Sequence, residues 1–254
     1  MSDAHRLRLA FSGLHPDRIR DLNSRFGGPA ATIAAITRRR VKASEAIRSS
    51  LAVPASRREA ELHSLGIAVV RRGEPIYPVH LDRFEDAPDL LFVRGDLPPV
   101  PGVGIVGTRR CTAYGLELAE AYGVAVAEVG WPVVSGLARG IDGAAHRWMV
   151  AAGGRGIAVL GCGIDVAYPR EHHRLGEQIL ETGGAIVSEY PPGSRPDAWR
   201  FPPRNRIIAG LSAAVVVVEA GITGGALITA VKAAEYGIAV FAMPGDVDRK
   251  TSDG

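Results

Sequence analysis

The sequence lacks most of the features that mark secreted, zinc-binding and membrane-spanning proteins. Its 254 residues include two cysteines, Cys111 and Cys162, which lie far apart and belong to no Cys-x-x-Cys or Cys/His spacing. Neither a disulfide framework nor a metal site is therefore predicted. The opening segment MSDAHRLRLAF has no apolar signal-peptide core, and no stretch of about 18 apolar residues occurs. We expect a cytoplasmic protein that does not associate with a membrane.

Strong net charge and abundant aromatic residues are also missing. The net charge of +3 permits a polyanionic partner without requiring one, so the local placement of cations must decide. Aromatic residues make up only 6% of the chain, which leaves Tyr168, Trp199 and Phe201 as candidates to stack on a ligand. For these three residues, core packing is the commoner role.

Three regions differ in their sequence pattern. Residues 1–62 are rich in Arg and Ala and predict a small helical N-terminal domain, broken at residues 27–29 and at Pro54. Residues 63–101 contain two short extended runs, at 67–70 and 90–93, and predict a connector with edge strands. A stiff proline-rich junction at 98–101 separates this connector from the core, residues 102–254.

Short apolar runs alternate with helical stretches throughout the core. The runs lie at 103–106, 132–135, 157–160, 185–188, 214–219 and 238–243, and helices are predicted at 116–128, 141–152, 171–181 and 226–236. This alternation is typical of a doubly wound, mostly parallel α/β sheet. The carboxyl ends of such strands meet at one edge, where ligands bind.

Glycine, hydroxyl and basic residues gather at three of the predicted strand ends. They are Gly107, Thr108 and Arg109 after the first core strand, Ser135, Gly136, Arg139 and Gly140 after the second, and Thr223 and Gly224 before the helix that carries Lys232. Free backbone N–H groups, a hydroxyl and a guanidinium are the parts of a phosphate cradle. Their repetition on neighbouring loops favours a nucleotide or a polyanion as the ligand.

Three arginines precede the most apolar run of the chain. The segment WRFPPRNRIIAGLSAAVVVVEA contains Arg200, Arg204 and Arg206, with Asn205 between the last two. A buried strand gains nothing from cations at its entrance, and Arg is well shaped to grip phosphate. The rigid pair at 202–203 fixes the direction of the basic run. We predict that this segment forms one wall of an anion site.

Familiar cofactor and catalytic motifs do not fit. Glycines at 102, 104 and 107 match Gly-x-Gly-x-x-Gly, but the strand lies inside the motif and no acidic residue closes the second strand, so no dinucleotide cofactor is predicted. The loop at 221–225 lacks the Gly-Lys-Ser/Thr end of a P-loop, and no serine has the surroundings of a nucleophile elbow. Glu219 fits either a general base or a group that caps backbone N–H donors. His172 and His173 are adjacent and would point to different faces of a helix.

Seven ordered segments resemble the DNA-processing protein A family, DprA/Smf. They are GTRRCTAYG, SGLARGIDGAAH, AVLGCGIDVAYPREHHRL, SEYPPG, FPPRNRIIAGLS, VVVVEAGITGGALITAVKAAEYG and AMPGD. The resemblance covers about residues 65–254, and residues 22–36 resemble the family's small SAM or helix-hairpin-helix-like domain more weakly. It implies an extended Rossmann-like domain in a non-catalytic protein that binds single-stranded DNA. It also implies protection of incoming DNA during natural transformation, loading of the RecA recombinase, and a homodimer.

The resemblance assigns site residues position by position. Gly107, Thr108 and Arg109 match a Gly-Ser-Arg phosphate loop with Thr in place of Ser; Ser135, Gly136, Arg139 and Gly140 match a second loop; Arg170 falls in a Tyr-Pro-basic motif; and Arg204, Asn205 and Arg206 match an Arg-Asn-Arg signature. Two other hypotheses stay open. A nucleotide phosphoribohydrolase would use Glu219 on a mononucleotide held by residues 221–225, although the signature of such enzymes is absent. A structural partner-binding protein would carry the basic rim incidentally.

Overall fold

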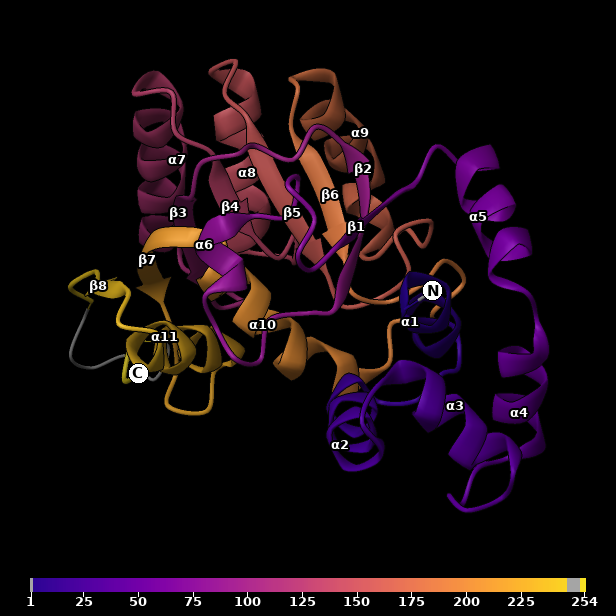
Figure 1. The fold of residues 1–254 in the computed structure, drawn as a ribbon. Helices are drawn as coiled ribbons and strands as arrows, with labels where there is room; N and C mark the ends of the chain where they lie inside the picture. Colours follow the sequence, from indigo (N-terminus) through magenta and orange to yellow (C-terminus); the bar gives the residue numbers. More distant parts are fainter. Residues whose placement is uncertain (1, 246–251) are drawn as a thin grey trace.

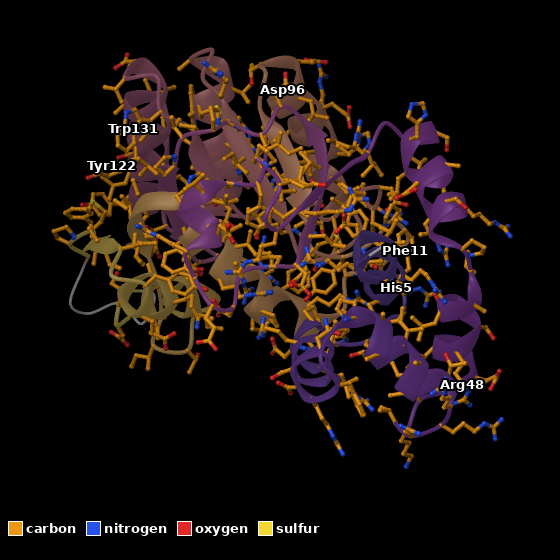
Figure 2. All side chains as sticks on the ribbon, in the orientation of Figure 1. His5, Phe11, Arg48, Asp96, Tyr122 and Trp131 are labelled. Atoms are coloured by element: carbon orange, nitrogen blue, oxygen red, sulfur yellow. The ribbon has the colours of Figure 1, made fainter. Side chains whose placement is uncertain are left out.

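The computed structural model describes residues 2–245 and 252–254. Its first part consists of α1 (Ser2–Ala10), α2 (Pro16–Phe26), α3 (Pro29–Thr37), α4 (Glu45–Ala52) and α5 (Ala55–Ser64). These helices enclose their own apolar cluster, which includes Leu9, Leu22 and Ile36. They also pack on the sheet that follows, where Phe11 meets Phe92 edge to face at 5.8 Å between ring centroids (Figures 1 and 2).

An eight-stranded sheet forms the rest of the structure. Its strands are β1 (Ala68–Arg71), β2 (Leu90–Gly95), β3 (Gly102–Gly107), β4 (Val133–Ser135), β5 (Gly156–Leu160), β6 (Ala185–Ser188), β7 (Ser212–Glu219) and β8 (Ala239–Ala242). Their spatial order is β1-β2-β6-β5-β4-β3-β7-β8. The strands from β3 to β8 pair in parallel, whereas β1 and β2 join the edge beside β6 in antiparallel fashion.

Helices cover both faces of the sheet (Figure 1). One face is covered by α7 (Ala113–Glu128), α8 (Ile141–Ala151) and α9 (His173–Glu181), and the other by α6 (Val79–Asp82), α10 (Phe201–Gly210) and α11 (Gly225–Glu235). Alternate residues of β7 serve the two layers, with Val216 and Val218 in one apolar cluster and Val215 and Val217 in the other. Burial on both faces explains why this strand reads as a continuous apolar run.

This arrangement confirms the predicted α/β fold with a mostly parallel, doubly wound sheet. All six core strands and both edge strands lie at the predicted positions within one or two residues. The helix predicted at 171–181 begins instead as a short 3-10 turn, η1 (Arg170–His172), followed by α9. The division into domains at residues 62 and 101 stays a prediction. None of the described helices is long and apolar enough to cross a membrane.

The arginine-rich segment before β7 is where the sequence prediction was wrong about structure. It was expected to run directly into the strand with its three arginines along one wall of an anion site, but residues 201–210 form the helix α10, preceded by the short turn η2 (Ala198–Arg200). Pro202 and Pro203 occupy the first turn of α10, where a missing N–H costs nothing and a fixed φ favours helix initiation. The proline pair therefore starts a helix, which turns successive side chains to different sides.

The strand order changes direction between β3 and β7. From β3 the chain winds through β4 and β5 to β6 on one side, and it then returns through α10 to β7 and β8 on the other. The loops that leave β3 and β7 consequently separate to opposite faces of the sheet. A crevice forms at the carboxyl ends of these two strands, as expected for an open α/β sheet.

Candidate functional site

A cleft of about 550 Å³ occupies this crevice. Its walls come from the loop after β3, the first turn of α8, the segment before η1, the start of α10 and the start of α11. The polar residues that line it are Thr108, Arg109, Arg110, Asp142, Tyr168, Arg204, Asn205 and Thr229. The volume falls in the range of small-molecule and nucleotide sites.

Arg109 and Arg110 are the exposed cations of the loop after β3. The Thr108 N–H donates to the Glu219 carbonyl oxygen at 2.7 Å, and the Thr108 hydroxyl accepts from the Arg110 N–H at 3.2 Å. These two bonds fix the loop. The Arg109 guanidinium lies 5.4 Å from the centroid of the Phe201 ring, at the wall of the cleft. It has no acidic partner within the described part of the chain and is available to an anion.

The loop after β4 contributes differently from the prediction. The Ser135 hydroxyl is fully buried and donates to the Ile105 carbonyl oxygen at 2.6 Å, so it belongs to the sheet and not to the cleft. Gly140 has φ 73°, and a Cβ there would stand 2.3 Å from the Thr108 carbonyl oxygen. Glycine at this position lets the two loops touch. Arg139 is exposed at the rim and pairs with Glu171, which lowers the pKa of that carboxyl to about 2.

Asp142, which the sequence analysis missed, organises the floor of the cleft. Its buried carboxylate accepts from the Gly136 N–H at 3.1 Å and faces the N–H groups of Gly107 and Ala138. The backbone donors predicted to be free for phosphate are therefore turned toward an internal anion. The only sequence signal for this role was an acidic residue in the first turn of α8, which alone indicates no more than favourable charge at a helix N-terminus.

Arg204 faces Asp142 inside the fold. Its guanidinium donates to the Gly136 carbonyl oxygen at 3.0 Å and to that of Val159, and its Nε donates to Asn205 at 3.1 Å. Burial raises the pKa of Asp142 and lowers that of Arg204, and each charge partly offsets this effect on the other. Arg204 thus lends positive charge to the cleft wall from a fixed, buried position.

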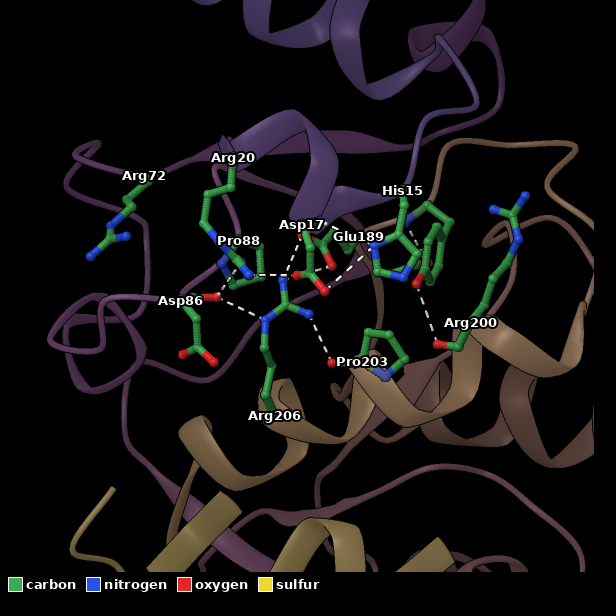
Figure 3. A network of polar contacts seen from close by, with 12 residues as sticks. His15, Asp17, Arg20, Arg72, Asp86, Pro88, Glu189, Arg200, Pro203 and Arg206 are labelled. Carbon is green, nitrogen blue, oxygen red and sulfur yellow. Dashed lines mark hydrogen bonds and ion pairs between the residues drawn. The ribbon is translucent and has the colours of Figure 1, made fainter. Parts of the chain in front are cut away.

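The Arg-Asn-Arg signature is split between two sides of α10. Asn205 lines the cleft with Arg204 and donates from Nδ2 to the Gly225 carbonyl oxygen at 3.0 Å. Arg206 does not line the cleft and instead reaches Glu189 and the Asp86 carbonyl oxygen (Figure 3). The prediction that all these arginines form one wall of an anion site is corrected by the helical turn, which separates Arg204 from Arg206.

Arg206 holds together segments that are far apart in the sequence (Figure 3). Its guanidinium donates to both carboxylate oxygens of Glu189, at 2.7 and 2.9 Å, and to the carbonyl oxygens of Asp86 and Pro203 at 2.7 and 2.8 Å. Although burial opposes the charge, Glu189 raises the pKa of Arg206 above its usual value. Each of the three guanidinium nitrogens therefore has a partner within the fold.

Two further predicted basic residues also lie outside the wall of the cleft. Arg200 pairs with Asp197 at 3.3 Å and lies over the rings of Tyr190 and Trp199. Lys232 pairs with Asp86 at 3.4 Å and with Glu235 at 2.6 Å. Both side chains are therefore committed to internal partners.

The remaining predicted residues lie at or near the rim. Gly224 lines the cleft at the start of α11, whereas exposed Thr223 precedes it in the loop. Arg170 is exposed at the start of η1, two residues after Tyr168, whose ring is 5.4 Å from that of Phe201. Asp246, the last residue of the AMPGD segment, lies outside the described residues.

Glu219 caps α7. Its Oε2 accepts from both the N–H and the hydroxyl of Thr112 at 3.0 Å, and the Thr112 hydroxyl in turn accepts from the Gly115 N–H at 3.1 Å. A Cβ on Gly115 would stand 2.3 Å from this carboxylate. Glu219 is buried and does not line the cleft. Of the two roles that the sequence left open, the structure shows the cap.

The histidines do not form a metal centre. Within residues 2–245 and 252–254, no group of three or more His, Cys, Asp or Glu side chains is arranged to hold a metal ion. His172 is buried with Nδ1 2.9 Å from the Leu137 carbonyl oxygen, whereas His173 is exposed. The adjacent pair thus points in different directions, as predicted.

Comparison with known proteins identifies the family. The sequence profile of the family described as DNA recombination-mediator protein A matches residues 68–254. The chain belongs to this family. The match begins at β1 and includes every segment of the cleft, so the resemblance inferred from the seven motifs is confirmed.

Curated relatives agree with this assignment. Protein Smf of Escherichia coli is 44% identical over 180 residues, which are 70% of this chain and 48% of that protein. DNA processing protein DprA of Bacillus subtilis is 41% identical over 185 residues, which are 72% of this chain and 62% of that protein. The chain therefore spans about half to two thirds of the length of these family members.

Two solved structures of family members have the same fold. DNA processing protein A from Streptococcus pneumoniae matches the whole chain and 91% of its own length, with a TM-score of 0.80 and 33% identity. A DNA processing protein A from Helicobacter pylori, whose structure was described for its single-stranded DNA binding mode, matches 73% of this chain and 84% of its own length, with a TM-score of 0.65 and 29% identity.

Proposed function

We propose that this chain binds single-stranded DNA through its phosphates, in the cleft at the carboxyl ends of β3 and β7. One observation carries the proposal: three arginines line the cleft, Arg109, Arg110 and Arg204, against one acidic residue, the buried Asp142. Arg204 neutralises that carboxylate from inside. The accessible charge of the cleft is consequently positive, and a chain of phosphates is the complementary ligand.

The geometry favours a flexible strand. Arg109 and Arg110 lie at the wall, while Arg170 and Arg139, which pairs with Glu171, are exposed on segments that border it. Cations placed in succession can follow the phosphates of a chain that bends, whereas a duplex is too stiff to follow a recessed path. The Tyr168 and Phe201 rings line the same cleft and offer faces on which a base can stack.

The relatives support a wider role. Proteins of this family carry names that denote DNA processing, and the Helicobacter pylori protein was described as binding single-stranded DNA. By this kinship we propose that the chain is a non-catalytic component of DNA processing in the cytoplasm, in which it protects incoming strands and assists RecA during natural transformation. A homodimer is part of the same proposal.

The hydrolase hypothesis gains nothing from the structure. It required Glu219 to act on a nucleotide held by residues 221–225, yet this carboxylate accepts two hydrogen bonds from Thr112 and lies outside the cleft. Glu219 lines a separate pocket of about 180 Å³, but none of the residues 221–225 lines that pocket, so the carboxylate and the loop that would hold the nucleotide do not share a site. Single-stranded DNA binding therefore remains the function that the site supports best.

The proposal is tested by equilibrium binding of an unstructured thymidine oligonucleotide to wild type and Arg109→Ala. Loss of one phosphate contact should weaken binding roughly fivefold at 0.1 M salt and reduce the salt dependence of the affinity by about 0.7 in log–log slope. Arg155→Ala is the matched control, because Arg155 is equally exposed but precedes β5 at the opposite edge of the sheet. Equal affinities of Arg109→Ala and wild type would refute the cleft as the binding site.

A further inference from the structure

Four cations stand together at the turn between α3 and α4. Arg38, Arg39, Arg40 and Lys42, here called the basic turn, are all exposed. Among the residues that the structure describes, none of these side chains has an ion pair or a hydrogen bond. This lack of partners contrasts with the committed arginines around Glu189 and Asp86.

The acidic residue nearest in sequence does not neutralise the basic turn. Glu45 pairs with Arg48 at 2.9 Å, and Arg48 also donates to the Ala43 carbonyl oxygen at 2.7 Å. Arg48 lies at the outer end of the helical part, as labelled in Figure 2. The positive charge of the turn therefore faces solvent uncompensated.

The backbone at Arg39 shows that this charge is kept at a cost to stability. The Arg39 N–H donates to the Ile36 carbonyl oxygen at 3.1 Å, and the Arg40 N–H donates to that of Ala35 at 2.9 Å. These two bonds form a Schellman cap, in which the residue at Arg39 adopts a left-handed conformation, here with φ 60°. Residues with a Cβ are disfavoured in this conformation, and glycine is the usual choice.

Every other described helix that ends with this pair of hydrogen bonds has glycine at the left-handed position. The helices α5, α7, α8, α9 and α11 end with the same bonds, and the left-handed residue is a glycine in each, namely Gly66, Gly130, Gly153, Gly183 and Gly237. Only α3, among the helix ends described, carries an arginine there. The cap also makes the turn rigid, so its cations are presented in a fixed arrangement.

A continuous series of contacts links the cleft to the basic turn. Ala198 lines the cleft, and the next residue, Trp199, packs on the His15 ring at 4.9 Å between centroids. His15 is the N-cap of α2, and Arg18 in the first turn of α2 donates to the Lys42 carbonyl oxygen at 2.7 Å. The first part of α2 thus bridges the segment that borders the cleft and the basic turn.

We propose that the basic turn is a second binding site for the phosphates of the single strand that occupies the cleft. The inference rests on the proposed function and extends it to the helical part of the chain. Its ligand is the same DNA strand after it leaves the cleft past Trp199. A strand long enough to reach both sites gains affinity from the second, whereas a short one does not.

Arg39→Gly tests this proposal, because the fold should benefit from the change. Glycine removes the strained residue, so the melting temperature should rise by about 2–4 °C. Affinity for a thymidine strand of about 30 nucleotides should nevertheless fall roughly fivefold at 0.1 M salt. Affinity for a strand of about 6 nucleotides, held by the cleft alone, should not change.

A double variant sharpens the comparison. Arg38→Gln combined with Arg40→Gln should weaken binding of the long strand about twentyfold. The control double variant, Arg147→Gln combined with Arg155→Gln, loses the same net charge elsewhere on the surface. Its affinity for the long strand should fall only by the smaller, general effect of that lost charge. If all turn variants bind the long strand as wild type does, the second site is refuted while the cleft stands. If wild type itself binds neither strand, the proposed function fails first, and the two failures are thereby distinguished.

Discussion

At the scale of single residues, burial decides which ionisable groups take part in binding and which support the fold. Asp142 and Arg204 are buried within the floor of the cleft, and Arg109 is exposed at its wall. A sequence pattern shows residue types but not their partners. Gly107 and Thr108 were predicted at the cleft because local order places them at a strand end. Asp142 was missed because its partners, Gly136 and Arg204, come together only in the folded chain.

His146 gives the clearest dependence of stability on pH. It is completely buried, and burial lowers its pKa to about 4 from an ordinary value of 6.5. In the unfolded chain His146 binds a proton as the pH falls below 6.5, whereas in the folded chain it binds that proton only near pH 4. The free energy of unfolding is therefore highest above pH 6.5 and should fall by up to about 3 kcal/mol between these values.

The measurement is urea unfolding of wild type and His146→Leu at pH 7 and pH 5. His80 also has a pKa lowered to about 4 by burial, so wild type alone does not isolate His146. The contribution of His146 is instead isolated by comparing the loss of unfolding free energy between pH 7 and pH 5 in the two proteins. We expect a smaller loss of stability on acidification in His146→Leu. An identical loss in both proteins would show that His146 does not carry the effect.

At the scale of secondary-structure elements, helix ends explain both the successes and the failure of sequence reasoning. Apolar alternation located the strands because burial on both faces imposes it. The glycines after α7, α8, α9 and α11 marked helix ends because left-handed residues close those helices. The proline pair at 202–203 was interpreted as fixing the direction of the basic run, whereas prolines at a first turn begin a helix. Because this helix was not predicted, Arg206 was expected in the same wall of the anion site as Arg204.

The start of α7 is capped by Thr112, whose N–H and hydroxyl are held by Glu219 of β7. Thr112→Ala removes both the hydroxyl that accepts from Gly115 and the donor to Glu219, and it leaves the buried carboxylate with fewer partners. We expect a loss of about 1–2 kcal/mol in the free energy of unfolding, measured with urea. Thr112→Ser keeps the hydroxyl and should lose much less. Equal effects of the two substitutions would argue against the cap.

At the scale of the whole molecule, the Arg206 network joins the lead-in to the sheet, β6, α10 and the helical part (Figure 3). Arg206 binds Glu189 and the Asp86 carbonyl oxygen, and Arg20 of α2 reaches the same carbonyl oxygen at 3.4 Å. No local sequence pattern could predict it, because residues 20, 86, 189 and 206 meet only through the tertiary fold. The Arg-Asn-Arg signature therefore combines two residues that line the cleft, Arg204 and Asn205, with one residue that secures the assembly, Arg206.

Arg206→Ala should consequently reduce stability rather than contact with DNA. Removing one partner of a buried ion pair leaves the other without compensation, so we expect a loss of about 3 kcal/mol in the free energy of unfolding. Glu189→Ala should show a similar loss. Binding measured well below the melting temperature, per folded molecule, should match wild type. A stable Arg206→Ala protein with sharply reduced affinity would return Arg206 to the binding site.

The central claim is that a single DNA strand lies in the cleft beside Phe201. Photo-cross-linking with an oligonucleotide that carries 5-iodouracil, followed by mass spectrometry of the linked peptides, tests it most directly. Linkage is expected at Tyr168 or Phe201, the two rings in the wall of the cleft. Linkage at Trp131, which is exposed just before β4 at the opposite edge of the sheet, with none in the cleft, would contradict it.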